Sequence, residues 1–600
     1  MELPQRQPGS QAPASQHSPT SPISTDQPIP ATEFSFLSSD LPEIEFAPSG
    51  PEFSESPVTA SRTIFLAKPN PFLEVLQSQA KEQAPQQKNG HLPHPKTTGP
   101  TTRQHPQQAF FQNGAKNGSS HGEQPNGAAI FSESPAANQT QSDFDEWAQP
   151  QQKRPDLVQA LQAIPEYASA AILDEDFAIP FLNALGFDEP EIVSQFPLNA
   201  EAVDYAARRN NQGDIFLHSL KDPYLYVEIK GRTQNLANES HPDYRRAFRQ
   251  LKHYLLHPQS ESVQWGILTN SRHVQVFHKH GKVIHPATPP LRLDQDTRAT
   301  LKHIRRILVP LSRALIVTVF NTKGGVGKTT TTLNLAATLA LMKKRVLIVD
   351  FDPLQSDLGH ALNLPPFVGK LFNLLRNKAT DARAVILPYR LKPPSLKEEL
   401  RFDIIVSDKA LTSNIDEIKL QQTIEIDALR CLLESVQTEY DYILVDPPSN
   451  HRFFAYQAIY AANVVLIPAR HDNLYSLQKA GTTITHVITK VKKRQEANGL
   501  PGVVALPIFM NNAFRVSDAQ VELMHQAIAK IINQTKRDTN GFDLTPYFYP
   551  KYQQNKRDRS INYIPYMADI SRADFIHTPA SLVSKNVFQR YLNLVKEYFI

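Results

Sequence analysis

The chain has 600 residues, a formal net charge of +4 and one cysteine, Cys431. This length exceeds what one hydrophobic core supports and predicts about two or three domains, and a single cysteine excludes a disulfide framework within the chain. The sequence has no run of about 18 apolar residues, which argues against a transmembrane helix, and its Met-Glu-Leu-Pro start argues against a signal peptide. We therefore expect a cytoplasmic protein with no membrane partner, whose mild basic excess permits nucleic-acid binding.

Residues 1–150 have low complexity, and 21 of the 48 prolines fall among them with many Gln, Ser and Asn. Such a composition buries too little apolar surface to offset the entropy of ordering. The segment is therefore predicted to be a disordered arm. One apolar patch at 63–76 departs from this composition, and it is either a short docking helix or a transient helix with no partner.

From about residue 155 to 285 the composition changes to that of a compact α+β unit. We expect a helix that opens at Glu175 and stops at Gly186, an apolar stretch around one acid at 202–206, a strand at 224–230, a helix over 244–254, and a hairpin of 265–270 with 273–277. The candidate catalytic residues of this unit are Asp204 and the Glu228-x-Lys230 pair. Alternate side chains of a strand share a face, so Glu228 and Lys230 are predicted to point the same way. Two carboxylates hold a hard divalent cation, and a lysine beside them can orient a metal-bound water for phosphodiester hydrolysis.

The order Glu175, Asp204, Glu228-x-Lys230 and Gln250 resembles the nuclease domain at the N-terminus of type I restriction-enzyme motor subunits, which belongs to the PD-(D/E)xK superfamily. The resemblance covers about residues 165–285. It implies that Asp204 and Glu228 are metal ligands and that Lys230 is the catalytic lysine. It also implies that Glu175 is a helix acid supporting the metal site and that Gln250 is the glutamine of a following motif. Such a domain is either an active endodeoxyribonuclease or a relic that only binds DNA.

Residues 286–314 are predicted to form a connector in which prolines precede a helix from about 294 to 308. Its polar side carries Lys302, Arg305 and Arg306, which we interpret as a solvated face, with DNA-phosphate contact as the alternative.

From 315 to 600 apolar strands alternate with helices, as in an α/β fold with a parallel sheet covered on both faces. The candidate strands are 315–320, 345–349, 442–445, 463–467 and 503–509. Between the first strand and the helix-like run 331–341 lies Asn321–Thr330, which is Gly-rich and predicts a phosphate-binding loop. Lys328 would reach the β- and γ-phosphates, and the Thr329 hydroxyl would bind Mg²⁺. The nucleotide-contacting set is Lys323, Gly324, Gly325, Val326, Gly327, Lys328, Thr329 and Thr330.

This loop departs from the plain P-loop pattern, because Thr322 stands where that pattern has glycine and Lys323 adds a lysine at the front. It resembles the deviant Walker A motif of the ParA/MinD ATPases. The resemblance implies ATP and Mg²⁺ as cofactors and a homodimer that forms on ATP binding, with Lys323 contacting the nucleotide of the partner subunit. It extends over nearly all of 315–600 and is closer to ParA than to MinD.

Acidic residues follow two of these strands, where ligands of parallel sheets bind. By resemblance to the ParA/MinD family, Asp352 positions the attacking water, while Asp350 and Asp446 help to hold Mg²⁺. The chain departs from the family in having Leu354 between Pro353 and Gln355. It also lacks the residue that the family commonly places between Asp446 and the following proline pair.

By the same resemblance, Asn511 or Asn512 contacts the base. ParA-type dimers bind DNA non-specifically, and a ParB-like protein is a candidate stimulating partner. The candidate phosphate-binding residues are Lys490, Lys492, Lys493, Arg494, Lys551, Lys556, Arg557, Arg559 and Arg572.

Three functions fit this sequence. The first is an ATP-switched nuclease for foreign-DNA defence or plasmid maintenance, associated with the nucleoid or a plasmid. The second is a ParA-type partition or positioning ATPase in which the nuclease-like domain only binds DNA. The third is a scaffold that recruits partners through its arm. Intact Asp204, Glu228 and Lys230 favour the first, and intact Lys323, Lys328 and Asp352 argue against the third.

Overall fold

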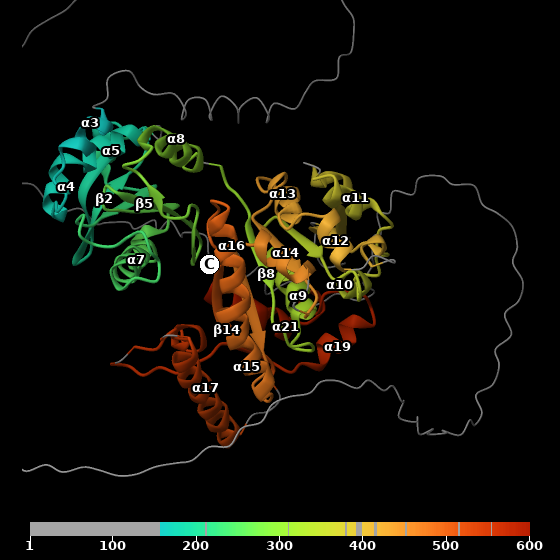
Figure 1. Ribbon diagram of the computed structural model, residues 1–600. Coiled ribbons are helices and arrows are strands. Elements are labelled where there is room, and N and C mark those ends of the chain that lie inside the picture. Colours follow the sequence, from blue (N-terminus) through green and yellow to red (C-terminus); the bar gives the residue numbers. More distant parts are fainter. Residues whose placement is uncertain are drawn as a thin grey trace, which may run out of the picture. The chain divides into compact units, whose positions relative to one another are not determined.

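The computed structural model describes residues 156–600 except 211–212, 310, 379–380, 392–398, 413–416, 451–452, 514–516, 540 and 554. The predicted arm at 1–150 and its apolar patch lie outside the described residues. Two sheets organise the described chain, one within 156–309 (the first sheet unit) and one within 311–600 (the second sheet unit), and both appear in Figure 1. No helix among the described residues is long and apolar enough to cross a membrane.

The first sheet unit has a seven-stranded sheet in the order β1-β2-β3-β4-β5-β6, with β7 paired to β5. Only β3 and β4 pair in parallel, while the other neighbours are antiparallel. The strands are β1 (Ile192–Leu198), β2 (Glu201–Ala207), β3 (Leu225–Ile229), β4 (Trp265–Thr269), β5 (His273–His280), β6 (Val283–Pro286) and β7 (Leu291–Arg292). The predicted strand 224–230 and the predicted hairpin are therefore confirmed, and the apolar stretch 202–206 lies in β2.

Helices cover both faces of this sheet. The helices are α3 (Leu157–Ala163), α4 (Ala170–Asp176), α5 (Ala178–Leu185), α6 (Phe216–Ser219), α7 (Pro242–Leu255) and α8 (Thr297–Ile307), with short 3-10 turns at Glu189–Glu191 and Pro258–Ser260. On one face, Leu225 and Val227 of β3 share a core cluster with α3, α5 and α8. On the other face, Tyr226 of β3 and Leu268 of β4 share a cluster with α7. Glu228 has the parity of Tyr226 on β3 and therefore lies on the face that α7 covers.

Two expectations for this unit are corrected. Glu175 does not open a helix, because it lies in the last turn of α4, which ends at Asp176, and a second helix begins after Phe177. The helix α8 is also not a free connector. Its apolar stripe of Leu301, Ile304 and the following Leu308 is buried in the core of the first sheet unit, and the Tyr224 hydroxyl donates to the Leu308 carbonyl over 2.8 Å.

The second sheet unit has an eight-stranded sheet in the order β10-β11-β9-β12-β8-β13-β14-β15, parallel except for the β10–β11 pair. Its strands are β8 (Leu315–Val319), β9 (Val346–Asp350), β10 (Leu387–Leu391), β11 (Leu400–Ile405), β12 (Tyr442–Asp446), β13 (Val464–Ala469), β14 (Val504–Ala513) and β15 (Tyr563–Pro565). All five predicted strands are confirmed, and β10, β11 and β15 were not predicted.

Alternate residues of β8 enter different cores, as a sheet covered on both faces requires. Leu315, Val317 and Val319 pack in a cluster with α9 and α21, whereas Ile316 and the following Phe320 pack in a cluster with α13 to α16. The longer helices are α9 (Lys328–Leu341), α11 (Lys370–Arg376), α12 (Glu417–Thr423), α13 (Ala428–Glu434), α14 (Phe453–Ala461), α15 (Leu474–Thr482), α16 (Thr489–Ala497), α17 (Asp518–Asp538), α19 (Ala568–Asp574) and α21 (Lys585–Tyr598). Shorter ones are α10 (Asp357–Ala361), α18 (Thr545–Phe548), α20 (Ala580–Val583), 3-10 turns at Ala382–Val385 and Lys409–Leu411, and a π-helical stretch, η5 (Thr483–Ile488).

Candidate active site

The predicted phosphate-binding loop lies between β8 and α9, at the carboxyl edge of the parallel sheet. Gly325 and Gly327 have φ angles of 72° and 82°, a region that residues with a side chain rarely adopt. Asn321 fastens the start of the loop, because its Nδ2 donates to the Pro468 carbonyl over 2.8 Å and its Oδ1 accepts from the Lys323 amide over 3.0 Å. The loop therefore has a fixed path ending at the N-terminus of α9, where unpaired backbone N–H groups favour an anion.

Asn511, near the end of β14, closes the other side of the loop. Its Nδ2 donates to the Val326 carbonyl over 2.9 Å, and the side chain is buried. A Cβ atom on Gly327 would lie 2.2 Å from this nitrogen, so Gly327 is required both by its φ angle and by this contact. Asn511, one of the two asparagines that the sequence left open, therefore contacts the loop.

Lys328, the first residue of α9, faces acidic side chains without pairing to one. Burial lowers the pKa of its ammonium group, and the nearby carboxylates of Asp446, Asp352 and Asp357 oppose this effect. Among the described residues Lys328 takes part in no ion pair, so its charge is available to a ligand. Asp357 opens α10 and was not singled out in the sequence, although an acid in a first helical turn close to Asp352 was a signal for it.

Asp446 ends β12 beside the first turn of α9. It is only 2% exposed, and burial raises the pKa of its carboxyl group to about 7 although Lys328 and the Thr329 hydroxyl lower it. Its Oδ1 atom is buried and has no hydrogen-bond partner. A buried oxygen without a partner is costly unless something binds it, so this atom indicates a position for a cation or a water.

Asp350 and Asp352 lie at the end of β9, next to β12 in the sheet. Asp350 is fully buried and accepts from the Gly359 amide over 2.9 Å, and burial raises the pKa of its carboxyl group to about 8. The Oδ1 atom of Asp352 accepts from the amides of Leu354 and Gln355, each over 3.2 Å. The additional Leu354 thus contributes a donor that orients Asp352.

Lys323 also makes no ion pair among the residues described. Its side chain is half-buried at the front of the loop. Beside it, the Thr322 Oγ1 atom is buried with no partner. The front of the loop therefore presents one cation and one hydroxyl group that the chain itself does not satisfy.

A second carboxylate cluster lies in the first sheet unit, where the sequence predicted it. Glu228 is fully buried, its Oε1 atom pairs with Lys230 Nζ, and its Oε2 atom has no hydrogen-bond partner. Burial and the nearby charge of Asp204 together raise the pKa of Glu228 to about 7, although Lys230 opposes this rise. Asp204 Oδ2 accepts from the Ile229 amide over 2.7 Å, so the structure brings both predicted acids and the lysine together.

Other predicted residues of this cluster are placed differently. Glu175 is exposed at the end of α4. Burial raises the pKa of Asp204, and the charge of Asp174, next to Glu175 in α4, adds to this rise. Asp174 is therefore the acid of α4 whose charge acts on this cluster. Gln250 on α7 donates to the Tyr254 hydroxyl over 3.0 Å, and the charges of Glu228 and Asp204 act on Tyr254.

Comparison with known proteins identifies the second sheet unit. A family model described as an AAA domain matches residues 314–499. The Chromosome partitioning protein ParA of Myxococcus xanthus is 31% identical over 225 residues, which is 37% of this chain and 72% of that protein. This chain belongs to the ParA family.

Other ParA-type proteins match shorter stretches. ParA of Caulobacter vibrioides is 31% identical over 192 residues and is covered over 67% of its length. The Sporulation initiation inhibitor protein Soj of Bacillus subtilis is 33% identical over 165 residues, with 60% of its length and 27% of this chain covered. Among solved structures, apo McdA of Cyanothece aligns over 48% of this chain at 21% identity with a TM-score of 0.36.

ATP with Mg²⁺ is the cofactor pair of ParA/MinD-type ATPases, and the residues at the loop fit it. The N-terminus of α9 and two unpaired lysines suit a polyphosphate. The free Oδ1 of Asp446 and the neighbouring Thr329 hydroxyl are oxygen ligands of the kind that Mg²⁺ prefers. No three His, Cys, Asp or Glu side chains in the described part of the chain form a ready metal cage, so phosphate oxygens and water would complete the coordination.

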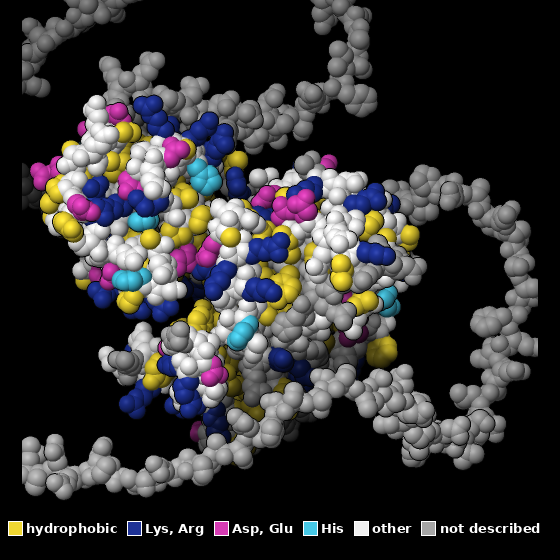
Figure 2. Space-filling view, in the orientation of Figure 1, with side chains coloured by type: hydrophobic (Ala, Val, Ile, Leu, Met, Phe, Trp, Pro, Cys, Tyr) yellow, Lys and Arg dark blue, Asp and Glu magenta, His cyan; other side chains and the backbone are white. Residues whose placement is uncertain are grey.

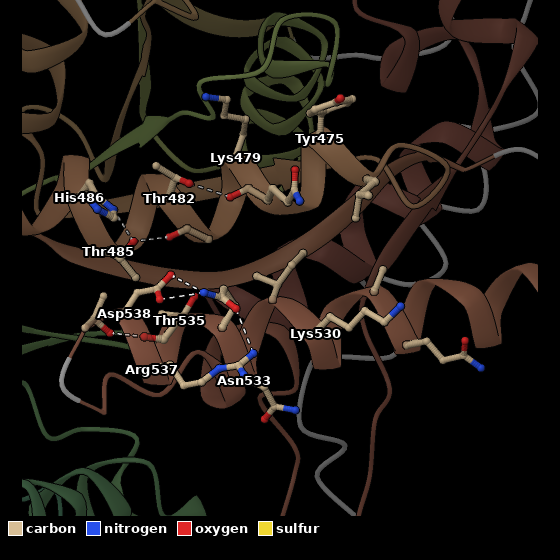
Figure 3. A pocket seen from close by; sticks show the side chains of 18 of the residues that line it. Tyr475, Lys479, Thr482, Thr485, His486, Lys530, Asn533, Thr535, Arg537 and Asp538 are labelled. Atoms are coloured by element: carbon tan, nitrogen blue, oxygen red, sulfur yellow. Dashed lines mark hydrogen bonds between the residues drawn. The ribbon is translucent and has the colours of Figure 1, made fainter.

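A groove of about 980 Å³ opens elsewhere on this ParA-family unit, between α15–η5 and α17 (Figure 3). Tyr475 and Lys479 line one side and Lys530 and Arg537 the other. It does not include the phosphate-binding loop.

Some predicted DNA-contact residues of this unit are paired within the chain. Lys492 pairs with Glu496, Lys551 with Glu597, and Arg572 with Asp569. The amine of Lys490 lies 5.2 Å from the ring centre of Tyr456.

Proposed function

We propose that this protein is a ParA-type ATPase that positions DNA or a DNA-bound cargo. ATP binding joins two copies of the chain, the dimer binds DNA without sequence preference, and ATP hydrolysis separates the copies. The observation that carries the proposal is the phosphate-binding loop, where Lys328 faces the buried Asp446 and Asp352 at adjacent strand ends. Neither Lys328 nor Lys323, at the front of the loop, forms an ion pair with another described residue.

Each group of the site has a role in this cycle. Backbone N–H groups from Gly324 to Thr330 and the Lys328 amine bind and orient the phosphates. Lys323 reaches the nucleotide of the second copy, which makes dimer formation depend on ATP. Asp352, held by two backbone amides, accepts a proton from the attacking water. Thr329, Asp350 and Asp446 would hold Mg²⁺, which would supply positive charge beside the phosphates. Asn511, and next to it Asn512, lie on the strand end beside the loop, where a nucleotide base would be contacted.

The relatives support positioning better than cleavage. Two of them are named chromosome partitioning proteins, and a structure of pNOB8 ParA bound to nonspecific DNA is among the similar folds. We therefore place the protein on the nucleoid or a plasmid, with a ParB-like protein as its stimulating partner. DNA cleavage, which the sequence favoured, gains no support from these relatives.

The test measures ATP hydrolysis, dimerisation and duplex binding by the wild-type chain and by Lys328→Ala. We expect ATP-dependent binding to a random-sequence duplex in the wild type and none in the variant. Duplex binding equal with and without ATP in the wild type would refute the proposed switch, and unchanged hydrolysis in Lys328→Ala would refute the assigned site.

A second candidate function is Mg²⁺-dependent DNA cleavage by the first sheet unit. The observation that favours it is the convergence of Asp204, Glu228 and Lys230, with a buried Glu228 Oε2 that has no partner. Two carboxylates offer a divalent cation an oxygen site that water and a phosphate complete, and Lys230 stands where it can orient a water. In this candidate, Asp174 or Glu175 would support the site from α4, and Gln250 from α7.

Incubation of supercoiled plasmid with Mg²⁺ tests this candidate beside Glu228→Gln. Nicking by the wild type that disappears in Glu228→Gln would support it. Nicking that persists in the variant would assign it to a contaminant, and an intact plasmid throughout would leave the unit as a DNA-binding relic.

A further inference from the structure

Helix α7 carries a dense stripe of positive charge. Arg245, Arg246, Arg249 and Lys252 are all exposed on its outer side, and its inner side is buried against β3 and β4 through residues such as Leu251 and Leu255. In Figure 2, Lys and Arg side chains gather at the lower edge of the first sheet unit, where Figure 1 draws α7. At about 1.5 Å of rise per residue, these four side chains extend over roughly 10 Å.

None of these four side chains takes part in an ion pair with another described residue. Elsewhere on the described surface arginines are commonly paired, as Arg292 is with Asp294 and Arg345 with Asp441. Like charges three or four residues apart on a helix repel each other slightly. The stripe therefore costs the isolated chain some stability, which a bound polyanion would offset.

The stripe borders the carboxylate cluster of the same unit. Residues i, i+4 and i+7 form one ridge of a helix, and Arg246, Gln250 and His253 occupy such a ridge. Gln250 contacts Tyr254, on which the charges of Glu228 and Asp204 act. An acidic pair repels a polyanion, so cations beside it are needed before any phosphate can approach.

We propose that this stripe binds the phosphate backbone of a nucleic-acid duplex and leads it to Asp204 and Glu228. This inference rests on the second candidate function for the location of the acids, although the binding itself does not require cleavage. Guanidinium groups match phosphate oxygens with two parallel hydrogen bonds. The stripe has no large exposed apolar side chain within α7, and such side chains anchor protein–protein interfaces. A duplex fits the stripe better than a protein partner does.

The test uses the full-length chain and a fluorescein-labelled 40-bp duplex in EDTA without ATP, so that neither an ATP-dependent dimer nor cleavage contributes. Arg246→Ala/Arg249→Ala is compared with Arg298→Ala/Lys302→Ala, which removes the same charge from exposed positions of α8 in the same unit. We expect the dissociation constant to rise about tenfold only in the α7 variant. The slope of log Kd against log salt should fall by about two, close to one per lost phosphate contact.

Equal effects of the two variants, or no effect of the α7 variant, would overturn the proposal, and so would loss of binding to phosphatidylserine vesicles with duplex binding unchanged. Arg246→Lys/Arg249→Lys keeps the charge and should retain most of the affinity, which separates binding from misfolding. Glu228→Gln should bind the duplex as tightly as the wild type. A wild type that binds through α7 but never nicks plasmid would refute cleavage alone, whereas nicking with unchanged binding in the α7 variant would refute the stripe alone.

Discussion

The two carboxylate sites of this molecule use the same residue types in different ways. In the first sheet unit, Lys230 pairs directly with Glu228. At the phosphate-binding loop, Lys328 acts on Asp446 and Asp352 only through space, and Asp446 keeps a buried oxygen without a partner. Both sites gather negative charge where water is excluded, which is expensive unless something compensates it.

The difference lies in what supplies the compensation. Lys230 neutralises its own acid, so the first site is partly satisfied by the chain alone. At the second site, Lys328 forms no ion pair with a described residue and Asp446 Oδ1 has no hydrogen-bond partner among them. This arrangement suits a ligand that carries negative phosphates together with a cation. An internal ion pair indicates that a site can persist empty, whereas unpaired opposite charges indicate a site completed by its ligand.

The largest expected effect is at Lys328, which forms no ion pair with any residue that the structure describes. Lys328→Ala should lower ATP hydrolysis about 100- to 1,000-fold, because one charged donor aimed at developing phosphate charge contributes about that much. Phosphate release under saturating ATP measures it. Lys530→Ala, which removes an exposed lysine of the α15–α17 groove, is the matched control. A loss of less than tenfold in Lys328→Ala would mean that Lys328 does not stabilise the phosphates. Its contrast with Lys230, which pairs within the chain, would then fail.

Lys323→Ala tests whether the second unpaired lysine serves another copy of the chain. Nucleotide binding by the single chain should change less than about threefold, while ATP-dependent dimerisation should weaken about tenfold or more, since the contact exists only between copies. Equilibrium titration with a fluorescent ATP analogue and analytical ultracentrifugation separate the two. A nucleotide affinity that falls as much as dimerisation would place Lys323 in its own site.

Breaking the internal pair tests the other half of the comparison. Lys230→Met leaves the Glu228 carboxylate buried without its partner and should lower the free energy of unfolding of the first sheet unit by about 2 kcal/mol, below the range for fully buried pairs because Lys230 is partly exposed. Urea denaturation followed by Trp265 fluorescence measures it. Lys230→Met/Glu228→Gln should recover most of the loss. Additive losses in the double variant would show that the two side chains are energetically independent.

The smallest expected effect is a loss of stability of the first sheet unit at acidic pH. Burial lowers the pKa of His285 to about 4, and the neighbouring His278 and His280 are shifted in the same direction. A folded-state pKa below the unfolded value means that the stability is present above about pH 6.5 and is lost as the pH falls toward 4. As the pH falls from 7.5 to 5.5, His285 alone should lower the free energy of unfolding by about 1 kcal/mol. In His285→Phe, the urea midpoint should depend less on pH over that range than it does in the wild type. A pH dependence equal to that of the wild type would mean that the His285 ring is not held neutral.

The sequence predicted the loop site more completely than the other site, for a physical reason. A phosphate-binding loop is ten consecutive residues, and its glycines, lysines and flanking strand and helix are all local. The acids of the first sheet unit come from β2 and β3, which are distant in the sequence. The helix acid that acts on them is Asp174, one position before Glu175 in α4, a helix that ends where the sequence predicted one to begin. The strand β11 was missed because its partners β9 and β10 define it, and no sequence signal marks that pairing. Asn511 and Asn512 were both candidates for the nucleotide base, and no local signal in the sequence marked the contact of Asn511 with the Val326 carbonyl.

The contact between Gly327 and Asn511 has a consequence for how the sequence can change over time. These positions are 184 residues apart in the chain, yet a side chain at one occupies the space of the side chain at the other. Neither position can drift alone: a larger residue at 327 needs both a left-handed backbone and a smaller partner at 511, while a smaller residue at 511 leaves the Val326 carbonyl without its donor. Among proteins that descend from this chain, positions 327 in the loop and 511 in β14 should therefore change together or not at all.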